Sequence, residues 1–202
     1  MSTPGYAVGH LRDRILAIHH ALDDTEVAHA FGGAIALIYY TEPRATNDVD
    51  INIFCTSEES GPVLDTMAAL GITVGEDRRL LAERDGQVRL RWSSVLPIDL
   101  FFANMEFHKA IRSAVNVVSF SGTTIPIIAE EHLIACKAIF NRPKDWIDID
   151  NMLRDAFSDL DVDEALKWVS LISDEDVVSR LHQALADHGF TNEADSAPTS
   201  PS

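Results

Sequence analysis

The stretch from residue 27 to residue 54 constrains the fold more than any other part of the sequence. A short apolar run leads into Gly32-Gly33, and a second apolar segment then continues without a breaker. After a turn, a third apolar run carries Asp48 and Asp50. Apolar runs separated by turn residues in this way predict a strand, a glycine turn, a helix, a loop and a second strand. The chain must therefore combine helices with a sheet.

The glycine pair and the two aspartates indicate a site for a charged ligand. Glycine accepts positive φ and places no Cβ between the backbone and a ligand, and the helix that it opens offers N–H groups to a phosphate. Asp48 and Asp50 lie two residues apart on the predicted strand, so both carboxylates leave the same face. A divalent metal relieves the repulsion between them. Taken singly, the glycines fit a plain turn and the aspartates fit a surface or capping role.

In this order, the residues resemble the signature of the DNA-polymerase-β-like nucleotidyltransferase superfamily. That signature is a Gly-Gly or Gly-Ser turn followed by Asp-x-Asp or Asp-x-Glu, and the gap from Gly33 to Asp48 is near its long end. The resemblance implies that Asp48 and Asp50 bind Mg²⁺ and that Gly32 and Gly33 contact a nucleoside triphosphate. It also implies a third acidic residue on an adjacent strand.

Asp99 fits the place of that third acidic residue. It lies within the apolar run from Leu96 to Phe102, where a carboxylate is costly to bury without a partner. By resemblance, Asp99 is a third metal ligand or the base for the attacking hydroxyl. The alternative is a carboxylate at a strand end in solvent.

A second block, from residue 129 to residue 153, extends the resemblance. A predicted helix over residues 129–140 carries Lys137 on its apolar part, where a lysine either snorkels or meets an anion. A break follows, and the next helix begins with Lys144-Asp145. The inward lysine, the break and the pattern Arg-x-Lys-Asp-x-x-Asp-Ile resemble the AbiEii-type nucleotidyltransferases, which include the MenT toxins of mycobacterial toxin–antitoxin pairs.

This second resemblance implies roles that the spacing does not assign to single residues. Either Lys137 or Lys144 contacts the triphosphate, and either Asp145 or Asp148 supports the site. Asp145 equally fits a helix cap, and Arg142 fits a phosphate contact or a surface position. The implied reaction moves a nucleotide to an acceptor hydroxyl and releases pyrophosphate. The implied acceptor is the tRNA 3′ end, which makes the chain a toxin with a partner antitoxin protein.

Thr46 stands two residues before Asp48, in the loop that enters the predicted metal strand. A phosphate on Thr46 brings negative charge to the metal and triphosphate pocket and is expected to inhibit. We treat this as a hypothesis about how an antitoxin acts.

The charge of the chain leaves the acceptor open. The net charge is −16, and residues 145–187 hold 12 acidic and 3 basic side chains. This acidity suits a cationic aminoglycoside better than RNA, so a small-molecule nucleotidyltransferase is one alternative and a non-catalytic nucleotide-binding module is another. Five arginines near Trp92 either track phosphates or lie on an exposed charged hairpin; they are Arg78, Arg79, Arg84, Arg89 and Arg91.

The fold class that we predict is α/β (α+β), a small mixed sheet flanked by helices and followed by a C-terminal helical bundle. We expect a nucleotidyltransferase core over residues 1–128, a helical region over 129–189 and a disordered tail over 190–202. The two cysteines fit a reducing cytoplasm, and we expect no membrane association because no apolar run reaches spanning length. We expect further helices over residues 8–23, 63–70 and 104–113, and two more after residue 160. We expect strands over 72–74, 87–92 and 96–102, and a hairpin over 115–128 that turns at Ser121-Gly122. The segment 75–85 is predicted to be charged and exposed.

Overall fold

The computed structural model describes residues 11–46, 48–93, 96–156 and 160–190. The chain divides into two compact units, one formed by Met1–Ile35 with Ala45–Ile128 and the other by Ala36–Arg44 with Ala129–Ser202. Of the predicted tail, residues 191–202 lie outside the described residues, as do residues 8–10 of the first predicted helix.

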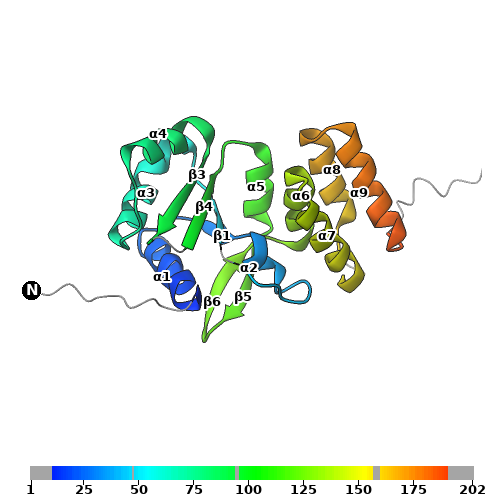
Figure 1. Cartoon of the computed structure of the whole chain (residues 1–202), viewed down its shortest axis with the longest axis horizontal. Coiled ribbons are helices and arrows are strands. Elements are labelled where there is room, and N and C mark those ends of the chain that lie inside the picture. The colour runs from blue at the N-terminus through cyan, green and yellow to red at the C-terminus, as the bar shows by residue number, and fades with distance from the viewer. Residues whose placement is uncertain (1–10, 47, 94–95, 157–159, 191–202) are drawn as a thin grey trace, which may run out of the picture. The chain divides into compact units, whose positions relative to one another are not determined.

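The first unit contains a six-stranded sheet with helices around it (Figure 1). The strands are β1 (His29–Phe31), β2 (Val49–Ile53), β3 (Gln87–Trp92), β4 (Leu96–Phe102), β5 (Asn116–Phe120) and β6 (Thr123–Ile127). The helices are α1 (Leu11–Asp24), the start of α2 (Gly33–Leu37), η1 (Ser57–Glu59, a 3₁₀ turn), α3 (Ser60–Ala69), α4 (Glu76–Asp85) and α5 (Glu106–Ser113).

The sheet is mixed, with strand order β3-β4-β2-β1-β6-β5. β2 runs parallel to β4 and β1 runs parallel to β6, while the other neighbouring pairs are antiparallel. The predicted fold class, a mixed sheet flanked by helices with a helical bundle, is confirmed. The neighbouring strands β2 and β4 carry the predicted acidic residues Asp50 and Asp99, and Asp48 directly precedes β2.

Alternation along β3 and β4 gives this part of the sheet one apolar face and one polar face. Val88 and Leu90 are buried on β3, while Arg89 between them is exposed. On β4, the buried residues Ile98 and Leu100 flank Asp99, which is only partly buried. Burial of each large aliphatic side chain contributes about 2 kcal/mol, and this fixes the register that places Arg89 and Asp99 on the other face.

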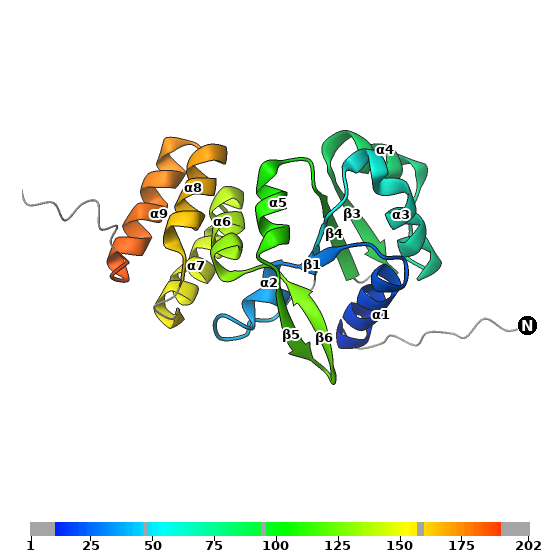
Figure 2. The ribbon, with the colours of Figure 1, turned by 180° about the vertical axis from the view of Figure 1, so that it is seen from behind.

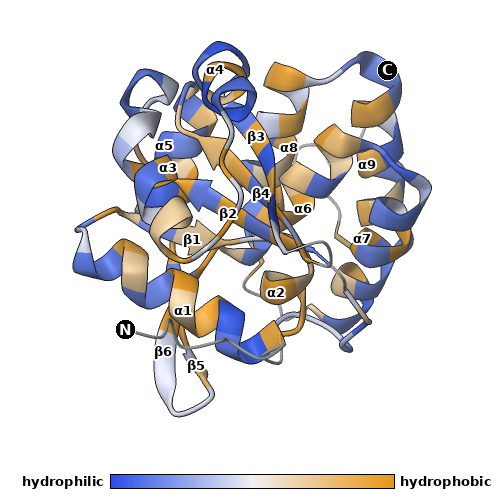
Figure 3. Ribbon diagram, turned by 60° about the vertical axis from the view of Figure 1, so that its left-hand side comes forward, coloured by the Kyte–Doolittle hydropathy of each residue, from blue (hydrophilic) through white to orange (hydrophobic). Residues whose placement is uncertain are grey.

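Helix α1 follows its predicted amphipathic pattern. Its buried residues include Ile15, Ile18 and Leu22, which are spaced to share one face, and Figure 3 shows the matching orange and blue bands along the helix. α1 packs against α3, and α3 in turn packs against α4. The predicted hairpin is also confirmed: Ser121 and Gly122 both have positive φ, as a two-residue turn between β5 and β6 requires (Figure 2).

One local prediction for residues 72–85 is wrong: the strand predicted over 72–74 is a single bridge between Thr73 and Arg91. The segment 75–85 is charged and largely exposed, as predicted, and it forms helix α4, which is capped by Gly86 with a left-handed φ of 68°. The sequence did not reveal this helix. Ala82 is its one buried residue, and an exposed helix lacks the apolar periodicity that identifies a buried one.

The second unit is a bundle of four helices, α6 (Glu130–Phe140), α7 (Pro143–Asp155), α8 (Val162–Ile172) and α9 (Glu175–Asp187). The segment 36–44 belongs to this unit, tied to α7 by the hydrogen bond from Thr41 to Asp155 and by the ion pair between Arg44 and Asp148. Throughout the described parts of the chain, no helix combines the length and the apolarity that crossing a bilayer requires.

Candidate active site

The sheet register of the first unit brings three charged residues into one row. Asp50 on β2 lies directly opposite Asp99 on β4, and Asp99 lies directly opposite Arg89 on β3. Residues that face each other across neighbouring strands project from the same face of the sheet. The side chains of Asp50, Asp99 and Arg89 therefore lie side by side on the more polar face.

The glycine turn lies against Asp50. Gly33 has φ +52°, and a Cβ built on it would lie 1.7 Å from Oδ2 of Asp50. The N–H of Gly32 donates to the carbonyl oxygen of Asp50 at 2.9 Å, and a Cβ on Gly32 would lie 3.1 Å from Nδ2 of the buried Asn52. Any substituent at Gly33 therefore displaces the Asp50 carboxylate, whereas a Cβ on Gly32 requires the Asn52 side chain to shift only by a few tenths of an ångström.

The predicted helix after the glycine turn is confirmed but short. α2 runs only over Gly33–Leu37, so it ends before the apolar segment does.

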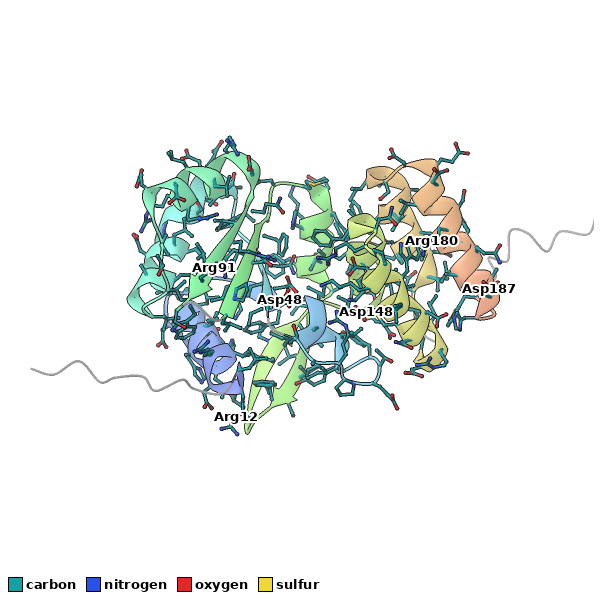
Figure 4. The ribbon with its side chains drawn as sticks, in the orientation of Figure 1. Arg12, Asp48, Arg91, Asp148, Arg180 and Asp187 are labelled. Carbon is teal, nitrogen blue, oxygen red and sulfur yellow. The ribbon has the colours of Figure 1, made fainter. Side chains whose placement is uncertain are left out.

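Asp48 is held by the loop that precedes β2. The hydroxyl of Thr46 donates to Oδ1 of Asp48 at 2.6 Å, and the backbone N–H of Asp48 lies 3.3 Å from the same hydroxyl oxygen. This local side-chain bond is typical of a threonine at a strand entrance. Asp48, labelled in Figure 4, is partly buried, as Asp50 is.

Asp99 forms a two-pronged ion pair with Arg89. Nε of Arg89 donates to Oδ1 of Asp99 at 2.7 Å, and a terminal nitrogen of Arg89 donates to Oδ2. The Asp99 side chain is 14% exposed and the Arg89 side chain 52%. The hydrogen bond to Asp99 raises the pKa of the Arg89 guanidinium against the opposing effect of burial, and the charges of Asp99, Asp48 and Asp50 raise it further. Arg89 is therefore within electrostatic reach of all three carboxylates.

The donor chemistry of the aspartates suits a hard divalent cation. Carboxylate oxygens are the ligands that Mg²⁺ prefers. Asp50 lies on β2 and Asp48 directly precedes it, and the charges of both act on Arg89. Within the described ranges, however, no group of three or more histidine, cysteine, aspartate or glutamate side chains is arranged to hold a metal ion. Two carboxylates fit the metal, and Asp99 is turned toward Arg89.

Lys137 meets an anion within the second unit. Its Nζ lies 2.6 Å from Oδ2 of Asp148, and both side chains are almost completely buried. The guanidinium of Arg44 donates to the same carboxylate at 2.7 and 2.8 Å. Burial acts to raise the pKa of Asp148, but the hydrogen bonds from Arg44 and Lys137 outweigh burial and hold that pKa below its usual value. Removing one member of this group would leave a buried charge without its counter-charge and so destabilise the folded protein.

Asp145 caps the start of α7. Its carboxylate accepts hydrogen bonds from the backbone N–H of Arg142 at 3.2 Å and from Nε of the same arginine at 2.6 Å. Asp145 is buried, whereas Lys144 beside it is exposed. The structure thus groups Lys137 with Asp148 and groups Asp145 with Arg142, while Lys144 faces solvent.

The sequence did not identify Arg89 and Arg44 as partners of the acidic residues. Arg89 had a detectable signal, since polar and apolar residues alternate along β3 and a hairpin with β4 places it on the face of Asp99. No sequence signal pointed to Arg44 as a partner, because it lies 104 positions from Asp148 in the chain. Four of the five clustered arginines pair with carboxylates: Arg78 with Asp77, Arg79 with Asp65, Arg84 with Asp85 and Arg89 with Asp99.

The fold is shared with solved nucleotidyltransferases. ANT(2")-Ia, solved in complex with adenylyl-2"-tobramycin, is 15% identical, with a TM-score of 0.55 over 79% of this chain and 95% of that one. An antigenic nucleotidyltransferase-like protein from Paracoccidioides brasiliensis is 14% identical, with a TM-score of 0.52 over 88% of this chain and 91% of that one. The chain has a nucleotidyltransferase fold. No protein-family model and no curated protein matches the sequence.

Proposed function

We propose that the chain transfers a nucleotide from a nucleoside triphosphate to an acceptor hydroxyl and releases pyrophosphate. The observation that carries the proposal is the placement of Asp50 and Asp99 opposite each other on adjacent strands, with Asp48 directly before β2 and the glycine turn packed on Asp50. A fold alone does not establish an activity, so the proposal depends on these residues.

In this proposal, Asp48 and Asp50 hold Mg²⁺, and Asp99 is the third ligand or the base for the acceptor hydroxyl. When bound, Mg²⁺ supplies neutralisation of the triphosphate charge. Gly32 and Gly33 let the phosphates approach the backbone beside Asp50. Thr46 orients Asp48 through its hydroxyl.

The lysines of the second unit enter the proposal with different tasks. Lys144 is exposed and is able to contact a triphosphate from solvent. Lys137 is buried on Asp148, so of the two lysines Lys144 is the one that we propose as the triphosphate contact. Asp145 supports the site by fixing Arg142 and the start of α7.

For the acceptor, we propose the 3′ end of tRNA. The support is the resemblance of residues 27–153 to AbiEii-type enzymes, and transfer to that end blocks aminoacylation. The protein is then a growth-inhibiting toxin with a cognate antitoxin. Phosphorylation of Thr46 stays a proposed means of control, because a phosphate there replaces the hydroxyl that Asp48 accepts from and adds negative charge.

A cationic small molecule is the second candidate acceptor. The observation in its favour is the pairing of Arg78, Arg79, Arg84 and Arg89 with carboxylates, which leaves little positive charge to track a phosphate backbone. The net charge of −16 favours a cation as well.

Transfer of radioactive label decides between these acceptors. Purified protein is incubated with Mg²⁺, each of the four α-³²P-labelled triphosphates, and either total tRNA or a panel of aminoglycosides. We expect label in tRNA with one or two of the triphosphates and none with Asp48→Ala, while Asp65→Ala, which alters an exposed acid on α3, retains transfer. Label in an aminoglycoside alone selects the second candidate. Metal-dependent triphosphate binding without transfer to any acceptor indicates a non-catalytic module.

A further inference from the structure

The ion pair between Arg89 and Asp99 is more than a surface contact. Exposed ion pairs contribute about 0–1 kcal/mol to stability, and the Arg89 side chain is 52% exposed, so its contribution to folding is small. Its position matters more, because it is the cationic member of a row whose other members are Asp99 and Asp50.

Arg89 and a divalent cation would both bind the carboxylate oxygens of Asp99. Both oxygens of the Asp99 carboxylate accept hydrogen bonds from the guanidinium. A carboxylate that binds Arg in this two-pronged way has its best lone pairs engaged, so a metal that uses Asp99 must take over at least one of those oxygens. The charge of Arg89, felt by Asp48 and Asp50 as well, also opposes the approach of a second cation.

We infer that Arg89 is a positioning residue that holds Asp99 away from the metal, and that a divalent cation must displace Arg89 to gain Asp99 as its third ligand. The inference rests on the proposed function, since it takes Asp48 and Asp50 to be the first two ligands. It explains why Asp99 lies beside Asp50 while no group of three acidic side chains is arranged to hold a metal in the described part of the chain.

Binding of Mn²⁺ alone tests the inference, without nucleotide or acceptor. Titrations of the full chain are followed by the electron paramagnetic resonance signal of free Mn²⁺. We expect Arg89→Met, which keeps the length of the side chain, to bind Mn²⁺ about 10-fold more tightly than wild type. Arg91→Met is the matched control, because Arg91 is exposed on the same strand and the same face but lies opposite Pro97. It should bind Mn²⁺ within about twofold of wild type.

A double-mutant cycle separates displacement from plain electrostatics. The tighter binding should shrink to a small electrostatic remainder when Arg89→Met is combined with Asp99→Asn, since no third carboxylate is then released. Unchanged Mn²⁺ affinity in Arg89→Met, an equal gain in Arg91→Met, or a gain of undiminished size with Asp99→Asn would each overturn the inference while leaving the proposed function intact. Failure of wild type and Arg89→Met alike to bind Mn²⁺, with both proteins folded by circular dichroism, would count against the proposed function itself.

Discussion

Among single residues, Gly33 is the one whose packing is most tightly constrained, because it lies against the side chain of Asp50. We expected from the sequence that the two glycines let a phosphate approach the backbone, and the structure adds a requirement that lies within the protein itself. Gly33 must lack a Cβ because the Asp50 carboxylate occupies that space. A glycine that makes room for the Asp50 carboxylate couples the turn to β2.

Substitution of Gly33 separates this contact from backbone strain. Gly33→Ala adds a Cβ 1.7 Å from Oδ2 of Asp50 at a φ of +52°, whereas Gly71→Ala places a Cβ in open space at a φ of +82°. We expect Gly71→Ala to lower the free energy of unfolding by about 1 kcal/mol through strain alone. Gly33→Ala should lose about 1–3 kcal/mol more and weaken Mn²⁺ binding. The measurements are urea unfolding and Mn²⁺ titration, and equal losses in the two variants would contradict the assigned contact.

The Thr46 hydroxyl gives a second prediction at this scale. Thr46→Val removes the hydrogen bond to Oδ1 of Asp48 and keeps the side-chain shape, so Mg²⁺-dependent triphosphate binding should weaken about 5-fold. Thr46→Ser keeps the hydroxyl and should stay near wild type. Isothermal titration with each triphosphate measures both, and a Thr46→Ser variant as weak as Thr46→Val would show that the methyl group matters instead of the hydroxyl.

At the scale of elements, strands with one buried face were predictable and exposed helices were not. The strands over 87–92 and 96–102 and the hairpin at Ser121-Gly122 follow from alternation and turn chemistry that act within a few residues. α4 is exposed along most of its length, so its apolar pattern carried too little information. The pairing of Arg89 with Asp99 required the register of a hairpin, and that of Arg44 with Asp148 required tertiary structure.

The buried triad of the second unit predicts a pH dependence. The folded-state pKa of Asp148 lies below its unfolded value, so the carboxylate contributes stability above the unfolded pKa of about 3.9. That contribution is lost as pH falls from about 4 through the lower folded-state pKa. We expect Asp148→Asn to cost about 3 kcal/mol at pH 7, because Lys137 then remains buried without its counter-charge.

Unfolding by urea between pH 3 and pH 7 measures this dependence. The difference between wild type and Asp148→Asn should shrink below pH 4. The control is Asp163→Asn, an exposed position on α8, which should change stability by less than about 0.5 kcal/mol. A constant difference across the pH range would mean that Asp148 does not draw its stabilising effect from its charge.

At the scale of the whole molecule, the acidity of the chain limits how it can meet RNA. The net charge is −16, and pairing with carboxylates engages four of the five clustered arginines. Under the proposed transfer to tRNA, recognition would depend on the 3′ end in the site and little on a broad phosphate track. The sequence showed both the charge and the arginines, but not their pairing, which only the fold creates.

Salt dependence tests this view of RNA binding. Affinity for total tRNA, measured by filter binding between 50 and 200 mM salt, should fall with a log–log slope shallower than about −2. A slope steeper than about −4 would mean that the arginines leave their carboxylates and contact phosphates.

The most direct test of the central claim is binding of nucleoside triphosphates, because it requires no knowledge of the acceptor. Equilibrium dialysis compares wild type with Asp48→Asn and Asp50→Asn, using Asp65→Asn as the surface control, with Mg²⁺ and with a chelator. We predict that at least one triphosphate binds only with Mg²⁺ and that Asp48→Asn and Asp50→Asn each weaken binding about 10-fold or more, while Asp65→Asn does not. Binding that is equal in all four proteins, or equal without the metal, would contradict it.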